Sequence, residues 1–351
     1  MKIAQISTCW RRTSPDGLSG VENVVSALTE QLVALGHDVT LYATGDSRTS
    51  AALWSRFPTA QKFEGWADEI EHVGAAYRHI AEGGFDVIHN HNFGLSLVSL
   101  YLSEVPCLTT IHNTPVQVWT MLQNIVARRH RFVSVSDAQR AFDQKPNWVA
   151  TVHNGINVED FPFGGEKDDY LLFVGRMNEA KGAHLAVQAA LASGRRLKLA
   201  GPLEIPVGQT SSQYFDEQIA PFVDGKTIEY VGEIGFEQKT ELYRRAAALL
   251  FPIQLDEPFG MVLIEAMACG TPVIAFRRGA AAEIVRHGEV GFLVGSIEEF
   301  LQALQSVGQI SPEACRRYVE ENFGSRLMAE RYVKVYEALL ESREARGAAP
   351  A

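Results

Sequence analysis

The sequence feature that most constrains the fold is an alternation of short apolar segments with longer amphipathic segments, which runs through both halves of the chain. The first repeat is a strand over residues 2–7, a polar loop, a helix over about residues 21–35 and a second strand over residues 38–43. Apolar residues of that helix recur at the spacing of one helical face. A strand, a helix and a strand in this order form the unit of a parallel sheet, so an α/β protein is expected.

The same pattern predicts further strands in each half of the chain. They lie at 85–89, 107–112, 132–136 and 148–153 in the first half, and at 170–175, 197–201, 227–232, 248–252, 272–276 and 292–294 in the second. Strands of the first half are followed by polar residues, among them His89, His91 and His112. The ligand crevice of an open α/β sheet lies beyond the carboxyl ends of its strands. A binding site is therefore expected at these polar positions.

The alternation of strands and helices is interrupted at residues 161–169, where Pro, Gly and charged residues are typical of a linker. A chain of 351 residues is also long for one hydrophobic core. We therefore expect two doubly wound, Rossmann-like domains, at residues 1–165 and 166–325, followed by a helical tract at 326–351. Two such domains joined by one linker create a cleft, which suits a ligand.

Composition excludes several classes of protein. The formal charge of −10, from 42 acidic and 32 basic residues, argues against broad binding to nucleic acid. The four cysteines are far apart and form no C-x-x-C pair, so neither a zinc site nor a disulfide framework is indicated and reduced thiols are expected. The polar start and the lack of a long apolar stretch predict a cytoplasmic protein. The basic run at 128–131 could contact anionic lipid, although a solvated face is the simpler interpretation.

The segment Glu257 to Pro272 has the pattern of an anion-binding helix. Pro258 places Glu257 in the entering loop, and a helix is expected to begin near Gly260 and to stop at Gly270. The amides at the start of such a helix, together with its dipole, favour an anion. Glu265 lies one to two turns along, so the two carboxylates are expected to contact different parts of one ligand, such as a nucleotide or a sugar phosphate.

A pair of cations follows the first strand of the second half directly. Arg176 and Lys181 lie in the segment from Gly175 to Gly182, on a loop at the carboxyl end of a strand. An arginine offers a planar fork and a lysine a mobile point charge, and both suit a diphosphate. A solvated basic turn is the alternative. The helix expected to begin near Gly260, which suits an anion, favours the interpretation of this pair as a ligand-binding site.

These motifs together resemble the nucleotide-sugar glycosyltransferases of the GT-B fold, specifically family 4. The resemblance rests on several segments: Gly175-Arg176 with Lys181-Gly182, Glu257-Pro258-Phe259-Gly260, Glu265 to Val273, His153 to Asn157, Glu283-Ile284-Val285, Gly291 to Val294 and, more loosely, Met328 to Tyr332. It covers nearly the whole chain and is most specific over residues 170–295. The family implies two Rossmann-like domains that face each other across a cleft, with residues 326–351 crossing back to the first domain.

The resemblance also assigns roles to single residues. The catalytic positions would be His112, Arg176, Lys181 and Glu257, and the donor-binding positions Gly20, Gly175, Arg176, Lys181, Phe259, Gly260, Met261, Val262 and Glu265. Arg176 and Lys181 would neutralise the donor diphosphate, Glu265 would hold the ribose and Glu257 the donor sugar. Gly20 would let a backbone approach the diphosphate or the acceptor, and His112 would contact the donor sugar near the reacting carbon.

The reaction that this resemblance implies is transfer of a hexose from a nucleotide-diphosphate sugar to the hydroxyl of a small molecule or glycan, with retention of configuration. A UDP-sugar is the first expectation and GDP-mannose the second. The family needs no metal or cofactor, and Asp168-Asp169 is interpreted as a solvated part of the linker. Two departures concern Ser19-Gly20, where the family often has two glycines, and Gly279 to Ala282, which lacks the usual proline. Neither affects the donor cations Arg176 and Lys181.

Three alternatives remain open. A glycoside phosphorylase or sucrose-synthase-like enzyme could use the same fold and residues in another direction. A noncatalytic protein could bind a sugar nucleotide without turning it over. His89, His91 and His112 could also ligate zinc in a hydrolase, although a packed histidine at a strand end is the preferred interpretation of His89.

Overall fold

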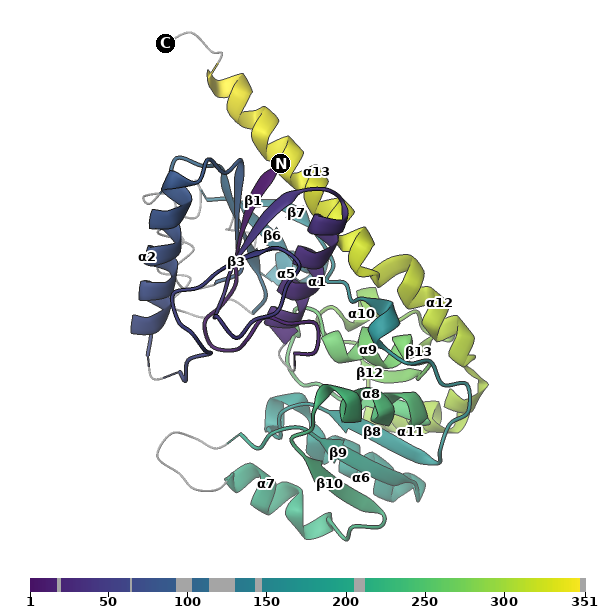
Figure 1. The fold of residues 1–351 in the computed structure, drawn as a ribbon. Coiled ribbons are helices and arrows are strands. Elements are labelled where there is room, and N and C mark those ends of the chain that lie inside the picture. The colour runs from purple at the N-terminus through teal and green to yellow at the C-terminus, as the bar shows by residue number, and fades with distance from the viewer. Residues whose placement is uncertain are drawn as a thin grey trace. The chain divides into compact units, whose positions relative to one another are not determined.

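The computed structural model describes residues 1–17, 20–63, 65–92, 103–113, 130–142, 147–204 and 212–347 (Figure 1). The chain divides into two compact units. Unit 1 comprises Met1–Asn157 and Gly324–Ala351, and unit 2 comprises Val158–Phe323. The sequence predicts that the second domain begins at residue 166, and unit 2 begins at Val158.

Unit 1 is built on a parallel sheet. Its strands are β1 (Lys2–Ile6), β2 (Asp38–Tyr42), β3 (Ala52–Trp54), β4 (Val87–Asn90), β5 (Cys107–Ile111), β6 (Phe132–Ser134) and β7 (Trp148–Thr151). Its described helices are α1 (Gly20–Ala34), α2 (Ala67–Glu82), α5 (Asp137–Phe142) and α13 (Ser325–Gly347). The strand order is β3-β2-β1-β4-β5-β6-β7. The order reverses between β1 and β4, which is where doubly wound folds bind ligands.

The helices of unit 1 cover the sheet with the apolar faces that the sequence predicts. In α1 the buried residues include Val24, Val25, Leu28 and Leu32, which share one helical face. Helix α2 contributes Val73, Ala76, Tyr77 and Ile80 to a cluster with Ile6, Tyr42 and Ile88 of the strands. Both helices are therefore held by burial of an apolar stripe.

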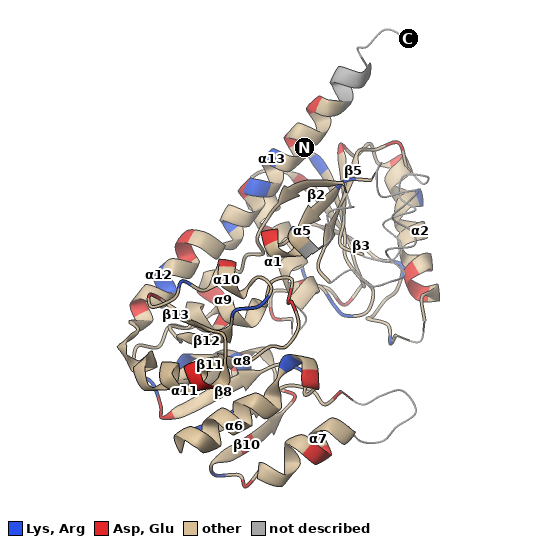
Figure 2. Cartoon of the chain, turned by 180° about the vertical axis from the view of Figure 1, so that it is seen from behind, with Lys and Arg blue, Asp and Glu red and all other residues tan. Residues whose placement is uncertain are grey.

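The C-terminal helix α13 belongs to unit 1, although it follows unit 2 in the chain. Its start is fixed because Ser325 N donates to Ile156 O at 2.8 Å and Gly155 N donates to Met328 Sδ at 3.1 Å. Tyr332 and Tyr336 are buried. Basic and acidic residues are interspersed along the helix (Figure 2), as in the ion pair of Arg326 with Glu330.

Unit 2 is built on a second parallel sheet. Its strands are β8 (Tyr170–Val174), β9 (Arg196–Ala200), β10 (Ile228–Gly232), β11 (Ala248–Phe251), β12 (Val273–Phe276) and β13 (Gly291–Val294). Its α-helices are α6 (Ala183–Ser193), α7 (Gln213–Gln218), α8 (Phe236–Arg245), α9 (Met261–Ala268), α10 (Ala281–Ile284), α11 (Ile297–Ser306) and α12 (Pro312–Phe323), and its short 3₁₀ turns are η2 (Val158–Asp160), η3 (Glu179–Lys181), η4 (Ala220–Phe222) and η5 (Val307–Gln309).

The strand order in unit 2 is β10-β9-β8-β11-β12-β13, so its reversal lies between β8 and β11. Helix α6 packs Ala186, Val187 and Ala190 into a core that Phe300 and Leu304 of α11 complete. The small residues of α6 allow a close approach to the sheet. Gly270 follows Cys269, the C-cap of α9, and has a φ of 78°, which makes it the C′ residue that the sequence predicts.

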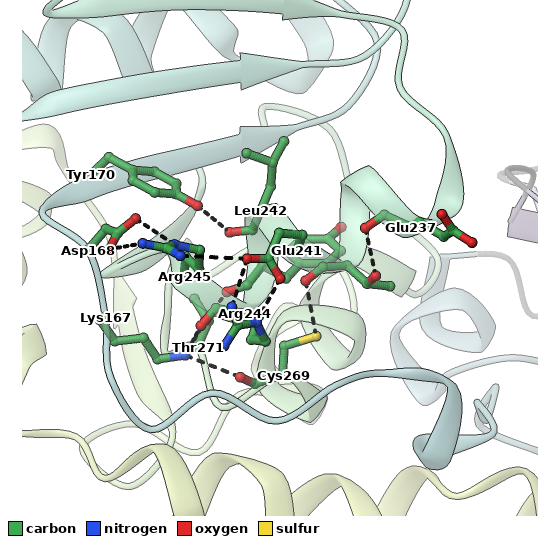
Figure 3. A network of polar contacts seen from close by, with 12 residues as sticks. Lys167, Asp168, Tyr170, Glu237, Glu241, Leu242, Arg244, Arg245, Cys269 and Thr271 are labelled. Atoms are coloured by element: carbon green, nitrogen blue, oxygen red, sulfur yellow. Dashed lines mark hydrogen bonds and ion pairs between the residues drawn. The ribbon is translucent and has the colours of Figure 1, made fainter.

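The segment expected to be a linker is attached to unit 2 (Figure 3). Lys167 Nζ donates to Arg244 O, Cys269 O and Thr271 Oγ1, at 2.9, 3.2 and 2.9 Å. The first two acceptors lie at the C-termini of α8 and α9, where carbonyls lack helical partners. Asp168 is not merely solvated, because Arg245 binds it through Nε and Nη2 at 2.8 and 2.9 Å. These contacts place the boundary between the units before residue 166.

Each strand that the sequence predicts is found within two residues of its expected ends. β3, α2, α5, α7, α10 and α11 were not predicted. Within the described ranges, no helix combines the length and the apolar character that a membrane crossing requires. Of the basic run at 128–131, residues 128 and 129 lie outside the described residues.

Candidate functional site

The candidate site in unit 2 is formed by loops at the carboxyl ends of β8, β9, β11 and β12. Gly201 has a φ of 138°, and a Cβ at this position would lie 2.0 Å from Gly175 O. The loops after β8 and β9 therefore touch through backbone at a point where a side chain cannot fit. Met177 N also donates to Pro202 O at 2.9 Å, which joins the same two loops.

Lys181 is fixed by the turn that carries it. Asn178 caps η3, since its Oδ1 accepts from Lys181 N at 2.9 Å. The next residue, Gly182, has a φ of 78°, and a Cβ there would lie 2.1 Å from Pro252 O. Only glycine allows this approach, which brings the turn against the loop after β11. Gln254 N closes the contact by donating to Ala180 O at 2.9 Å.

Glu257 is held through its backbone by the loop after β12. Ala280 N donates to Glu257 O at 3.0 Å. Gly279 has a φ of 50°, and a Cβ at this residue would lie 2.3 Å from the same carbonyl oxygen. The segment without the expected proline thus has a glycine in the left-handed conformation that supports Glu257. Helix α9 then begins at Met261 after Gly260, whose φ is 89°.

The two loops meet in an ion pair. Lys181 Nζ lies 2.5 Å from Glu257 Oε2, and the two side chains are 21% and 20% exposed. The sequence predicts these two residues as parts of one site, and 75 residues separate them in the chain. Their partial exposure leaves both groups open to exchange partners with a ligand.

Arg176 lies on the same loop but has another partner. Its guanidinium is 61% exposed and lies 4.0 Å from Glu204 Oε1. Asn178 Nδ2 donates to the other oxygen of Glu204. An exposed pair at this distance contributes little to stability, so Arg176 is available to bind an anion.

Glu265 is placed differently from the other predicted donor residues. It is 4% exposed, and its Oε1 and Oε2 lie 3.2 and 3.1 Å from Lys239 Nζ. Tyr243 donates its hydroxyl to Oε2 at 3.0 Å. Burial, followed by the charge of Glu265, raises the pKa of Tyr243 well above its usual range. A carboxylate has about four acceptor sites, and these contacts use three, which leaves one on Oε1.

The remaining predicted donor residues of α9 and its entering loop are largely enclosed. Phe259 is 3% exposed and packs edge-on against Phe323 with ring centroids 6.0 Å apart. Gly260 is buried, and Met261 and Val262 are half-buried. Their backbone amides, rather than their side chains, are the groups through which they could act.

In unit 1, His112 follows β5 and contacts a second histidine. His112 Nε2 lies 3.0 Å from His91 Nδ1, and His91 Nε2 lies 2.8 Å from Gln5 Oε1. Burial lowers the pKa of His112 to about 4. Gly20 is the first residue of α1, while Leu18 and Ser19 of the same loop lie outside the described residues.

The histidines do not converge as metal ligands would. His89 is fully buried at the end of β4 and bonds to Thr110 Oγ1 and Tyr336 through its two ring nitrogens, at 2.7 and 2.8 Å. This is the packed role that the position of His89 at a strand end predicts. Among the residues that the structure describes, no three His, Cys, Asp or Glu side chains are arranged to hold a metal ion.

Several residues that build the site were not predicted. Lys239 and Tyr243 lie four residues apart on α8, and both are buried in a helix that is rich in charged residues. That spacing on one face is the signal that could have identified them. Asn178, with its capping position before Lys181, is a second example. Glu204 carries no local signal, because its role depends on the contact between two loops.

Comparisons with known proteins agree with this geometry. The family described as "Glycosyl transferases group 1" matches residues 159–322, and "Glycosyltransferase Family 4" matches residues 18–160. The solved structure of AviGT4, a glycosyltransferase involved in avilamycin A biosynthesis, has a TM-score of 0.74 and 28% identity, covering 97% of this chain and 98% of that one. The fold and these matches thus define a glycosyltransferase of the GT-B type. The chain belongs to glycosyltransferase family 4.

Relatives and other structures extend this result. Phosphatidyl-myo-inositol mannosyltransferase of Mycobacterium tuberculosis is 27% identical over 310 residues, which are 81% of this chain and 81% of that protein. Sucrose-phosphate synthase from Thermosynechococcus elongatus shares the fold with a TM-score of 0.80 and 21% identity, covering 97% of this chain and 99% of that one. The prediction of two Rossmann-like parallel-sheet domains of the GT-B type is confirmed.

Proposed function

We propose that this glycosyltransferase moves a hexose from a nucleotide-diphosphate sugar to an acceptor hydroxyl, with retention of configuration and without a metal ion. The observation that carries the proposal is the contact between Lys181 and Glu257. It joins a cation suited to a diphosphate with a carboxylate suited to sugar hydroxyls. The contact lies where the strand order of unit 2 reverses, between β8 and β11.

The charges of the site support binding of a diphosphate. Lys181 pairs with the carboxylate of Glu257, and Arg176 is 61% exposed beside Glu204. A diphosphate carries more negative charge than either carboxylate, so it can attract both cations. Glu257 would then accept hydrogen bonds from the sugar. Glu265 would accept one from a ribose hydroxyl through its remaining acceptor site on Oε1.

In the proposed reaction the acceptor oxygen forms a bond to the anomeric carbon as the bond to the phosphate oxygen breaks. The electron pair of the broken bond stays on the departing diphosphate, which also takes the proton of the acceptor hydroxyl. Arg176 and Lys181 stabilise the charge that develops there. Attack from the face that the diphosphate leaves retains the configuration without a covalent intermediate on the protein.

We expect the donor to be a UDP-sugar first and GDP-mannose second, and the acceptor to be a small molecule or a glycan. Anabaena HepE, a structure of the same fold with a TM-score of 0.73 and 17% identity, covering 96% of this chain and 100% of that one, holds UDP and glucose. The mannosyltransferase relatives favour the second donor. The four cysteines are buried thiols that form no disulfide with one another, which suits a cytoplasmic enzyme.

A screen of thermal stability against nucleoside diphosphates and nucleotide sugars tests the proposal. A ligand that binds the native state raises the apparent melting temperature. The donor that stabilises most should then support transfer in the presence of EDTA, and NMR of the product should show the donor's anomeric configuration. Inversion, or a requirement for metal, would refute that part of the proposal. Binding without turnover would indicate a noncatalytic protein, and activity with a glycoside and free phosphate or nucleoside diphosphate would indicate a phosphorylase or sucrose-synthase-like enzyme.

A further inference from the structure

A continuous chain of hydrogen bonds in unit 1 connects α13 with His112. We name it the histidine relay, and its members are Gln5, His89, His91, Thr110, His112, Tyr332 and Tyr336. The members come from β1, β4, β5 and α13 and from the residues that follow β4 and β5. They lie at the reversal of the strand order between β1 and β4. All members except His112 are buried.

The amide of Gln5 sets the direction of this relay. Its Nε2 donates to the Tyr336 hydroxyl at 3.0 Å, so its Oε1 is directed to His91. An amide oxygen only accepts, so His91 Nε2 carries the proton that it donates to Gln5. In a neutral imidazole the other nitrogen is then an acceptor. His91 Nδ1 therefore accepts from His112.

The same reasoning fixes the tautomer of His112. Its Nε2 must carry the proton that is donated to His91 Nδ1, across 3.0 Å. Its Nδ1 is consequently the nitrogen with the free lone pair. A sugar hydroxyl can donate to this nitrogen, whereas the opposite tautomer would present an N–H group. The orientation of one amide in β1 is thus transmitted through His91 to His112.

The second branch of the relay anchors Gln5 to α13. Because the Tyr336 hydroxyl accepts from Gln5, its own proton is available to His89 Nδ1, at 2.8 Å. His89 then carries its proton on Nε2 and donates to Thr110 Oγ1, at 2.7 Å. Thr110 in turn contacts the Tyr332 hydroxyl at 2.8 Å. Two tyrosines one turn apart on α13 therefore hold the far end of the relay.

Burial keeps the relay uncharged. It lowers the pKa of His89 and His91 well below the usual range, and neighbouring histidines lower both further. With three neutral imidazoles, the positions of the protons are decided by the hydrogen bonds and not by ion pairs. A neutral relay can hold one tautomer at physiological pH.

We propose that Gln5, His91 and Tyr336 are positioning residues, which hold His112 as its Nε2–H tautomer so that Nδ1 accepts a hydrogen bond from a substrate hydroxyl. The identity of that hydroxyl as part of a sugar rests on the proposed function. The tautomer itself does not, because it follows from contacts within unit 1. His112 on this view is a neutral acceptor and not a general acid.

The tautomers can be measured without substrate. In full-length protein labelled with ¹⁵N-histidine at pH 7, two-bond ¹H–¹⁵N spectra distinguish Nδ1–H, Nε2–H and charged rings, and His112→Gln and His91→Gln spectra assign the signals. We expect Nε2–H tautomers for His89, His91 and His112. A Nδ1–H or charged His112 in the wild-type protein would overturn the proposal.

Tyr336→Phe tests the anchoring of the relay, with Tyr77→Phe as its matched control. Both tyrosines are buried in unit 1, and the Tyr77 hydroxyl accepts from Asn90 Nδ2, an amide that is not a member of the relay. Tyr336→Phe should give His112 a mixture of tautomers and lower kcat about tenfold with unchanged KM, the size of one net hydrogen bond. Tyr77→Phe should leave the tautomers as in the wild type. An unaltered His112 spectrum in Tyr336→Phe would also refute the relay.

The two proposals fail separately. Expected tautomers in a protein that neither binds nor transfers a nucleotide sugar would refute the proposed function and leave the relay intact. Transfer activity combined with the opposite tautomer of His112 would refute the relay and leave the proposed function intact.

Discussion

Lys239 Nζ lies within 3.2 Å of both carboxylate oxygens of Glu265, and the two side chains are 10% and 6% exposed. The pair joins α8 to α9. Charges that are removed from water in this way depend on each other, because the loss of one leaves the other buried without compensation. The side chain predicted to hold the nucleotide is thus oriented by a cation that lies outside the predicted motif.

We predict that Lys239→Met destabilises unit 2 by about 3 kcal/mol, the typical cost of leaving a buried charge unpaired. Lys198→Met is the matched control, since Lys198 pairs with Glu229 at 3.3 Å with both side chains more exposed. That change should cost less than about 1 kcal/mol. Urea denaturation followed by circular dichroism measures both. Equal losses of unfolding free energy in the two variants would show that the buried pair contributes no more to stability than the exposed one.

Arg176→Ala and Lys181→Ala should each lower the rate of transfer by about 10²-fold or more, since each removes a charge that stabilises the leaving group. The fold should persist, because Arg176 is exposed and Lys181 is partly exposed. Arg196→Ala removes an exposed arginine outside the site and should transfer at the wild-type rate. Near-normal kcat/KM in either site variant would contradict the assignment of the diphosphate cations.

Replacing each of the two glutamates should weaken the binding of a different part of the donor. Glu265→Gln should weaken the binding of nucleoside diphosphate more than Glu257→Gln, because Glu265 is proposed to hold the ribose and Glu257 the transferred sugar. Calorimetry with the nucleoside diphosphate and with the complete nucleotide sugar measures both effects. The loss from Glu257→Gln should be seen with the nucleotide sugar. The reverse order with the nucleoside diphosphate would refute this division.

Gly182→Ala should abolish donor binding and destabilise unit 2 by several kcal/mol, because its Cβ would overlap the carbonyl oxygen of Pro252. Gly194→Ala is the control, since Gly194 also has a positive φ of 66° but nothing lies within 4 Å of its Cβ. This second change should cost about 1 kcal/mol, the strain of the left-handed conformation alone. Similar donor affinity in the two variants would show that the Lys181 turn does not depend on the close approach.

Much of the fold could be predicted from local sequence, for a physical reason. A strand such as β11 is buried along its whole length and appears as a short apolar run. The strand β3 was missed because it is a three-residue edge strand whose residues are largely exposed. A run of three residues is too short to distinguish this strand from a loop.

The boundary between the units and the partners of Glu265 could not be predicted in the same way. Lys167 lies in a segment whose composition indicates a linker, yet its ammonium group binds carbonyls at the ends of two helices. Those helices end far apart in sequence and meet only in the folded unit. Lys239 and Glu265 are likewise 26 residues apart, so only tertiary packing brings them together.

Unit 1 should lose stability as the pH falls from about 6.5 toward 4. Burial lowers the pKa values of His112 and His130 to about 4, so below pH 6.5 the unfolded chain binds protons that the folded unit does not. Stability then decreases by about 1.4 kcal/mol per pH unit for each such histidine. All five tryptophans fall within residues 1–157, so their fluorescence in urea at pH 7 and pH 5 follows unit 1. His130→Gln should reduce the slope of the unfolding free energy against pH by about 1.4 kcal/mol per pH unit, the contribution of one proton. An unfolding free energy that does not change between these pH values would contradict the prediction.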